Sequence, residues 1–177
     1  MPNAPMHHRT GDAMHLIQML YLMLPVYFAN MAPPFVKYWH GWNRPICVPL
    51  LGSHKTIVGF GAGVAVAVIV VLIQRLVDCQ RGAPTAMDWL PFGIVAGICA
   101  MAGDSIKSFF KRRLRLAPGS RWIPFDQLDF VLGGLFALNF FVPLGWIDVI
   151  EICIISFVAD VLVNQLSFAL GIRDTKW

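Results

Sequence analysis

The run TIVGFGAGVAVAVIVVLIQ, residues 56–74, contains no charged side chain in nineteen consecutive positions. A helix of roughly 20 apolar residues crosses the core of a lipid bilayer, so this run predicts a transmembrane helix. The rest of the chain is similar: 57% of its 177 residues are hydrophobic, 14% are charged, and the mean hydropathy is +0.64. Because soluble domains average about 25% charged residues, we predict an all-α integral membrane protein.

Four further apolar runs bring the predicted transmembrane helices to five, at residues 13–36, 56–74, 89–106, 128–147 and 150–172. Residues 1–177 then form one polytopic membrane domain, with cytoplasmic loops at 37–55 and 107–127. A cleaved signal peptide is the alternative for the first run, but that run is longer than the usual signal core of about 7–15 residues.

Lysine and arginine set the predicted orientation, because short cytoplasmic loops are enriched in them. With five spans, eleven of the 14 Lys and Arg residues lie on the side of the C-terminus. We therefore expect the C-terminus in the cytoplasm, the N-terminus outside, and the protein in the cell membrane. Glycine pairs at GxxxG spacing, Gly59 with Gly63 and Gly93 with Gly97, predict close helix packing and permit a homodimer.

Between the third and fourth predicted spans the sequence reads GDSIKSFFKRRLRLAPGSRWIPFDQLD, residues 103–129, with six cations and three carboxylates. If the third helix continues beyond the membrane surface, Asp104, Lys107 and Lys111 share one helix face. A basic interfacial helix that binds anionic lipid headgroups is the plainer alternative. Asp104 argues against it, because a carboxylate in the last turn of an apolar span is costly without a partner.

Two more carboxylates, Asp126 and Asp129, lie three residues apart where the fourth helix is predicted to begin. At this spacing both can point to one place, as a hard divalent cation with oxygen ligands requires. The alternative is that Asp126 caps the helix and Asp129 complements its dipole. Together with Asp104 they flank the cationic run, which fits Mg²⁺ bridging to substrate phosphates and predicts a polar site at the cytoplasmic side.

A Gly-Ser-His-Lys-Thr element with Ser53, Lys55 and Thr56 precedes the second span. Free N–H groups at a helix N-terminus attract anions, so the element is a candidate for phosphate binding. A lysine at a cytoplasmic span end is also a common membrane anchor, and this alternative stays open.

Three polar side chains fall within the predicted spans. Asp160 and Asn164 lie one turn apart in the fifth span, and we expect them to line a cavity, because intramembrane acids usually serve function. The structural alternative is a hydrogen bond to a neighbouring helix, for example from Asn139. Asn30, near the cytoplasmic end of the first span, is a candidate for the same cavity.

The motifs GDSIKSFFKRRL, Pro118-Gly119 and PFDQLDFVLGG, with Ala29-Asn30, the Gly52–Thr56 element and the C-terminal LGIRD, resemble the CDP-archaeol synthase family. This family is the archaeal branch of the CTP:phosphatidate cytidylyltransferase superfamily. The resemblance extends over nearly the whole chain, and the GD-x-x-KS-x-x-KRR and PFDQLD blocks are its most specific parts. It implies a Mg²⁺-dependent reaction of CTP with the ether lipid phosphate 2,3-bis-O-(geranylgeranyl)-glycerol 1-phosphate, which yields a CDP-lipid and pyrophosphate.

The resemblance also implies residue roles. Asp104, Asp126 and Asp129 are the expected Mg²⁺ ligands, and with Lys107 and Lys111 they form the expected catalytic set. The expected residues for CTP and phosphate binding are Asn30, Ser53, Lys55, Thr56, Lys107, Lys111, Arg112 and Arg113. The expected partners are CTP, an isoprenoid ether lipid phosphate whose chains lie in a groove between spans, and membrane lipids, with no nucleic acid.

Three other functions stay open at the level of the residues. A diacyl phosphatidate cytidylyltransferase would use the same chemistry on a different lipid. An ion-coupled transporter would use Asp160 and Asn164 as a midplane site, although the sequence shows no related halves. A structural membrane subunit would need none of the three clustered carboxylates.

Overall fold

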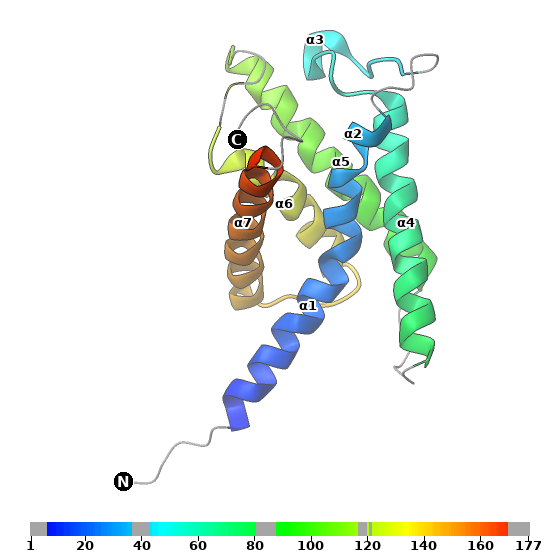
Figure 1. Cartoon of the computed structure of the whole chain (residues 1–177), viewed down its shortest axis with the longest axis vertical. Coiled ribbons are helices and arrows are strands. Elements are labelled where there is room, and N and C mark those ends of the chain that lie inside the picture. The colour runs from blue at the N-terminus through cyan, green and yellow to red at the C-terminus, as the bar shows by residue number, and fades with distance from the viewer. Residues whose placement is uncertain (1–6, 37–42, 81–87, 117–119, 121, 170–177) are drawn as a thin grey trace.

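The computed structural model describes residues 7–36, 43–80, 88–116, 120 and 122–169. The helices in these ranges (Figure 1) are α1 His7–Met31, α2 Pro33–Val36, α3 Val48–Leu51, α4 Ile57–Gln80, α5 Trp89–Arg113, α6 Phe125–Asn139 and α7 Trp146–Ala169. Extended structure within these ranges is limited to an isolated antiparallel bridge between Pro45 and Thr56. The predicted all-α fold is confirmed.

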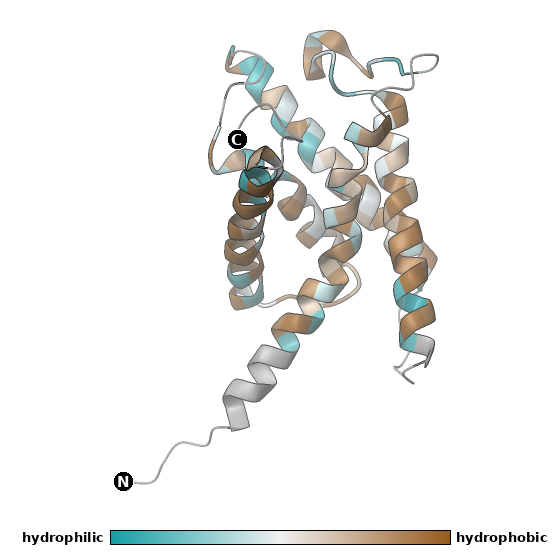
Figure 2. Ribbon diagram, in the orientation of Figure 1, coloured by the Kyte–Doolittle hydropathy of each residue, from teal (hydrophilic) through white to brown (hydrophobic). Residues whose placement is uncertain are grey.

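Several helices are suited to a membrane. In the described part of the chain, three stretches are long and apolar enough to cross one: His15–Val36, Ile57–Asp78 and Trp89–Arg113. α7 has 24 residues, whereas α6 has only 15. Figure 2 shows hydrophobic residues along most of α4 and α7, with hydrophilic residues near the C-terminal end of α4 and near both ends of α7. The count of five spans and their orientation remain predictions.

Prolines divide the first predicted span. The apolar run 13–36 forms α1 and the short α2, with Ala32 between them. Pro33 and Pro34 follow directly, and a proline has no N–H group to continue the hydrogen-bond ladder of a helix. The second predicted span agrees with α4, which continues to Gln80.

Helices extend from both sides into the predicted cytoplasmic loop 107–127. α5 continues to Arg113, and α6 already begins at Phe125. The lysine, arginine and serine residues after 106 are compatible with a helix, and no glycine or proline follows until Pro118. The first charged residues after 106 therefore show where the polar part of α5 begins, but α5 itself ends later, at Arg113. Residues 37–42 of the other predicted loop lie outside the described residues.

The predicted spans 128–147 and 150–172 place the boundary between the last two helices too late. α6 ends at Asn139 instead of 147, and α7 begins at Trp146 instead of 150. Pro143 and Gly145 interrupt the helix, and the Asn139 side chain accepts a hydrogen bond from the Leu144 N–H group at 3.3 Å. The intervening residues are mostly apolar, so a hydropathy pattern runs through this turn without a break.

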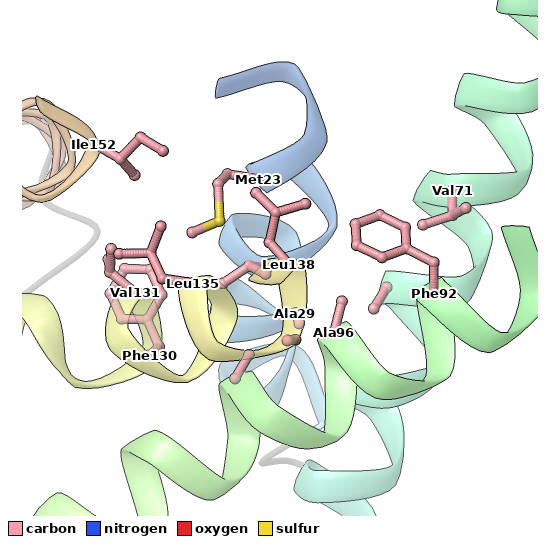
Figure 3. Close-up of a cluster of buried hydrophobic side chains, with 14 of the residues drawn as sticks. Met23, Ala29, Val71, Phe92, Ala96, Phe130, Val131, Leu135, Leu138 and Ile152 are labelled. Atoms are coloured by element: carbon pink, nitrogen blue, oxygen red, sulfur yellow. The ribbon is translucent and has the colours of Figure 1, made fainter. Parts of the chain in front are cut away.

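The core lies where α1, α5 and α6 meet, with residues from α4 and α7 at its edges (Figure 3). Met23, Val26, Val131, Leu138 and Ile152 are almost fully buried. Every long helix also exposes large apolar side chains, among them Ile17, Ile69, Ile98, Phe136 and Leu162. In lipid such an outer surface is favourable, and the helices then associate through close van der Waals packing.

Glycines bring α5 and α6 into backbone contact. A Cβ atom added at Gly103 would overlap the carbonyl oxygen of Asp129, and one at Gly133 would overlap the carbonyl oxygen of Cys99. The two contacts are reciprocal, since each helix presents a glycine to a carbonyl group of the other. This close approach places the start of α6 directly beside the polar half of α5.

The glycines at GxxxG spacing in α5 pack against α4. A Cβ atom at Gly97 would lie 2.8 Å from Val64 Cα, and one at Gly93 would lie 3.0 Å from Val68 Cα. The helix packing predicted from this spacing is therefore present within the chain. A homodimer stays a prediction.

Candidate active site

Side chains from α5 and α6 meet around one lysine ammonium group. Lys107 Nζ lies 3.2 Å from Asp104 Oδ1, 2.6 Å from Asp129 Oδ2 and 3.6 Å from Asp126 Oδ1. Asp104 and Lys107 lie one turn apart on α5, and the first turns of α6 supply the other two aspartates. The three carboxylates singled out in the sequence thus converge on a single point.

This cluster is largely withdrawn from solvent. The side chains of Asp104, Lys107 and Asp129 retain 12%, 16% and 5% of their accessible surface. In such a setting the loss of one charged partner leaves the others uncompensated, which is strongly unfavourable. The charges of the cluster therefore depend on one another.

Each aspartate of α6 has one oxygen bound to the backbone and one directed at a lysine. Asp126 Oδ2 accepts a hydrogen bond from the Trp122 N–H group at 2.7 Å, and Asp129 Oδ1 accepts one from the Phe130 N–H group at 2.7 Å. The capping alternative does not hold, because the N-cap of α6 is Pro124 and Asp126 binds a backbone N–H that precedes the helix. The second oxygen of Asp126 belongs to the cluster. The backbone bonds fix the direction of both carboxylates.

Two further lysines extend the cluster. Lys111 Nζ lies 2.5 Å from Asp126 Oδ1 and donates to the Ser120 carbonyl oxygen at 2.9 Å. Lys55, from the segment before α4, pairs with Asp104 Oδ2. The two oxygens of Asp104 therefore bind lysines from different parts of the chain.

Backbone contacts hold Lys55 in place. The Lys55 carbonyl oxygen accepts a hydrogen bond from the Ile46 N–H group at 2.8 Å. The next residue, Thr56, directly precedes α4. Its Oγ1 accepts a hydrogen bond from the Gly59 N–H group at 3.1 Å, as helix-capping hydroxyls do. Figure 1 shows this segment and α3 at the same end of the bundle as the C-terminal end of α5.

Arg112 packs against a turn that requires glycine. Gly52 has φ +83°, a conformation that side-chain-bearing residues rarely adopt. A Cβ atom at Gly52 would lie 3.1 Å from Arg112 Nε, and this nitrogen is buried without a hydrogen-bond partner among the described residues. From the sequence, Gly52 and Arg112 were both expected in elements that bind anions, but no pattern in the sequence indicated that the two elements are in contact.

Two cavities adjoin the cluster on different sides of α5. A small one of about 40 Å³ is lined by Lys55, Asp104 and neighbouring residues of α2 and α4. A larger, almost entirely apolar one of about 670 Å³ lies between α5 and α6, and Lys107 and Asp129 are part of its lining. Charged residues of the cluster therefore line both a small cavity of mixed polarity and a large apolar one.

The oxygen donors of the cluster suit a hard divalent cation. Asp126 Oδ1 and Asp129 Oδ2 are buried and lie 2.5 Å and 2.6 Å from lysine nitrogens. Mg²⁺ prefers carboxylate oxygens and usually combines one or two of them with phosphate oxygens. Within the described ranges no group of three or more Asp, Glu, His or Cys residues is arranged as a ready metal site, and Lys107 Nζ lies between the carboxylates. The donor set fits Mg²⁺ once that amine moves aside.

A family model described as "CarS-like: CDP-archaeol synthase" matches residues 13–177. The chain belongs to this family. The CDP-archaeol synthase of Sulfurisphaera tokodaii is 32% identical over 164 residues, covering 87% of this chain and 92% of that protein. The CDP-archaeol synthase of Methanospirillum hungatei is 31% identical over 175 residues, covering 88% of this chain and 100% of that protein.

A solved structure also matches this member of the CDP-archaeol synthase family. It is described as "Structural insight into an intramembrane enzyme for archaeal membrane lipids biosynthesis", with a TM-score of 0.71 and 28% identity over 84% of this chain and 94% of that one. With the apolar helices described above, this match identifies the chain as a multi-pass membrane protein. The resemblance inferred from the motifs is confirmed.

Some residues expected from the family motifs lie apart from the cluster. Ser53 and Arg113 are exposed, and Asn30 is on the last turn of α1. None of these three lines either of the two cavities. The Pro118-Gly119 and LGIRD parts of the family motifs lie outside the described residues.

Asp160 and Asn164 pair with each other on α7. Asn164 Nδ2 donates to Asp160 Oδ2 at 2.8 Å. The alternative partner Asn139 instead accepts the Leu144 N–H group in the turn after α6. Neither Asp160 nor Asn164 lines the two cavities beside the cluster, so a cavity-lining role for them stays a prediction.

Proposed function

We propose that this chain transfers the cytidylyl group of CTP to an archaeal ether lipid phosphate, 2,3-bis-O-(geranylgeranyl)-glycerol 1-phosphate, and releases pyrophosphate. Membership in the CDP-archaeol synthase family supports this activity. The observation that carries the site is the contact of Lys107 Nζ with three buried carboxylates. Such a cluster, at the polar end of apolar helices, suits a reaction between a charged nucleotide and a lipid.

The chemistry needs alignment and charge compensation more than proton transfer. An oxygen of the lipid phosphate attacks the α-phosphorus of CTP, a new P–O bond forms, and the bond from that phosphorus to the α–β bridging oxygen breaks. The lipid phosphate is already an anion at neutral pH, so the barrier comes mainly from bringing two anions together in line. Groups that compensate this charge in the transition state lower the barrier.

The residues of the cluster are proposed to compensate the phosphate charge in different ways. Asp104, Asp126 and Asp129 are proposed to hold Mg²⁺, which neutralises phosphate charge when bound. Lys55, Lys107 and Lys111 lie close enough to these carboxylates to bind phosphate oxygens beside the ion. Arg112 offers its buried Nε at the Gly52 turn. We propose that the site faces the cytoplasm, where CTP is available, in keeping with the distribution of Lys and Arg.

Transfer of labelled cytidylate to lipid tests the proposed function. Purified protein in detergent micelles is incubated with α-phosphate-labelled CTP, Mg²⁺ and either the geranylgeranyl ether lipid phosphate or a diacyl phosphatidate. We expect labelled lipid and free pyrophosphate, more product with the ether lipid, and none after chelation of Mg²⁺. Absence of labelled lipid with both acceptors would refute the proposal, and preference for the diacyl lipid would assign the bacterial-type substrate.

The change Asp126→Asn tests the carboxylate roles. Asparagine retains an oxygen for the Trp122 N–H group but loses the charge, so we expect kcat to fall about 10²-fold, by analogy with the loss of one transition-state partner. The Mg²⁺ concentration for half-maximal rate should rise. Glu151→Gln, at an exposed position of α7, is the control and should leave both quantities unchanged. An Asp126→Asn protein with normal turnover and normal Mg²⁺ dependence would contradict the assignment.

A further inference from the structure

Lys107 lies among the carboxylate oxygens that a shared dication would need. Its Nζ atom is 2.6 Å from Asp129 Oδ2, 3.2 Å from Asp104 Oδ1 and 3.6 Å from Asp126 Oδ1. The backbone holds the second oxygen of Asp126 and that of Asp129, and Lys55 pairs with the second oxygen of Asp104. Because Mg²⁺ requires its ligand oxygens at about 2.0–2.1 Å, an ion that binds the remaining oxygens takes the place of the Lys107 ammonium group.

The charges of the cluster balance one another. The three carboxylates contact three lysines, Lys55, Lys107 and Lys111. A dication added to this arrangement would leave positive charge without a partner. The side chains of Asp104, Lys107 and Asp129 retain at most 16% of their accessible surface, and uncompensated charge is strongly unfavourable where water is largely excluded. Mg²⁺ by itself is therefore a poor competitor for these carboxylates.

The cavity beside Lys107 offers the displaced amine no new anion. This cavity lies between α5 and α6, and its lining includes Ile106, Leu132 and Phe136. The carboxylate in the lining is that of Asp129, which already belongs to the cluster. An ammonium group moved toward such surroundings loses its hydrogen bonds without replacement. A metal ion can therefore take the carboxylates when another anion receives the amine.

The phosphates of a nucleotide supply that anion. A lysine ammonium group has three N–H donors, and its hydrogen bonds to phosphate oxygens are strong because both partners are charged. Mg²⁺ usually binds one or two carboxylates and combines them with oxygens of substrate phosphates. A nucleotide bound beside the cluster thus compensates the dication and the released ammonium group of Lys107 together.

We propose that Lys107 blocks the metal site until CTP binds. The phosphates of CTP take the Lys107 ammonium group, and Mg²⁺ then binds Asp104, Asp126 and Asp129 together with the nucleotide. This inference rests on the proposed cytidylyltransferase function. Because coupling between two ligands is reciprocal, Mg²⁺ raises the affinity for CTP by the factor by which CTP raises the affinity for Mg²⁺. Metal and nucleotide therefore bind as a pair.

Lys111 provides the matched comparison for Lys107. It also lies on α5, but it contacts Asp126 alone among the three carboxylates, together with the Ser120 carbonyl oxygen. Lys111→Met removes the same charge from the same helix as Lys107→Met does. It leaves Lys107 in place among the carboxylates, so the block should persist in this variant.

Binding of Mn²⁺, followed by electron paramagnetic resonance, tests the block without turnover. Mn²⁺ favours the same oxygen ligands as Mg²⁺, and the signal of aqueous Mn²⁺ disappears when the ion binds to protein. The wild-type protein in detergent micelles is titrated with Mn²⁺, with and without a CTP analogue whose α–β bridging oxygen is replaced by a methylene group. The Mn²⁺ bound by the analogue alone is subtracted.

We expect the analogue to lower the Kd of the wild-type protein for Mn²⁺ at least tenfold. Equal Kd values with and without the analogue would overturn the proposal, and so would the absence of Mn²⁺ binding in both titrations. This comparison uses the wild-type protein and does not depend on the folding of a variant.

The two lysine variants assign the block to one residue. Without the analogue, Lys107→Met should bind Mn²⁺ at least tenfold more tightly than the wild-type protein does. Lys111→Met should still need the analogue for tight binding. Equal Mn²⁺ affinities of the two variants, each shown to be folded by circular dichroism, would overturn the role of Lys107.

Failure of this inference can be distinguished from failure of the proposed function. Formation of CDP-lipid by a protein whose Mn²⁺ affinity does not depend on the analogue would refute the block by Lys107 and leave the cytidylyltransferase function intact. Analogue-dependent Mn²⁺ binding that is lost in Lys107→Met, in a protein that forms no CDP-lipid, would refute the proposed function and support the block.

Discussion

Replacing Lys107 with methionine is expected to cause the largest loss of activity and a large loss of stability. The Lys107 ammonium group contacts Asp104, Asp126 and Asp129, and only 16% of the Lys107 side-chain surface remains accessible. Methionine has a similar length but no charge, so buried Asp129 would lose the lysine that contacts it, while Asp104 and Asp126 would retain Lys55 and Lys111. Breaking a buried ion pair in this way costs about 3–5 kcal/mol, and we expect kcat to fall about 10³-fold.

Mg²⁺ should partly restore the stability of the Lys107→Met protein. A dication bound by the three carboxylates replaces the missing positive charge, and ligand binding to the folded state raises the unfolding temperature. Thermal unfolding in detergent, with and without Mg²⁺, measures this effect. The wild-type protein should respond less, because its Lys107 amine competes for the same position.

Lys111→Met serves as the comparison for Lys107→Met, because it removes a lysine that contacts fewer carboxylates. Lys111 contacts Asp126 alone among the carboxylates, together with the Ser120 carbonyl oxygen. Its loss should therefore destabilise the protein less and produce a smaller response to Mg²⁺. Equal unfolding temperatures for both variants would show that the carboxylates do not share one ion site. The same conclusion would follow if Mg²⁺ left the unfolding temperature of the Lys107→Met protein unchanged.

The change Gly133→Leu is expected to separate α5 from α6. A Cβ atom at Gly133 would overlap the carbonyl oxygen of Cys99, and backbone atoms cannot move aside as the end of a flexible side chain can. Overpacking of this kind costs about 1–3 kcal/mol and occasionally more, and we expect a value at the upper end. Because Asp129 and Lys107 come from the two helices that would separate, activity should fall together with the unfolding temperature.

Gly61→Ala is the matched control for Gly133→Leu. A Cβ atom at Gly61 would meet nothing within 4 Å, and alanine is favoured over glycine within a helix by about 1 kcal/mol. The unfolding temperature of this variant should stay the same or rise, with normal activity. A Gly133→Leu protein as stable and active as the Gly61→Ala protein would contradict the close contact of α5 with α6.

The sequence predicted the helices better than their ends. The uncharged run at 56–74 identified α4 because a membrane helix must be apolar along its whole length. The turn between α6 and α7 was misplaced, because Pro143 and Gly145 act through backbone geometry while their neighbours remain apolar. α5 continues beyond the predicted span end at 106 to Arg113, as the shared helix face of Asp104, Lys107 and Lys111 required.

The sequence also identified most of the charged residues of the site. Asp104 stood out as a carboxylate at the end of an apolar span, and the spacing of Asp126 and Asp129 indicated a shared target. The position of Lys107 between these three carboxylates did not follow from spacing, because it depends on the packing of α6 against α5. The contact of Arg112 with Gly52 likewise joins segments that are distant in the chain.

Composition and periodicity by themselves determined that the chain is helical, that it belongs in a membrane and which side chains carry its charge, because these properties depend only on the order of residues along the chain. Tertiary structure alone decided which charges meet and where an apolar cavity opens beside them. The reason is steric: Gly103 and Gly133 allow two backbones to touch. That contact places Asp126 and Asp129 next to Lys107. It also leaves the apolar cavity between α5 and α6.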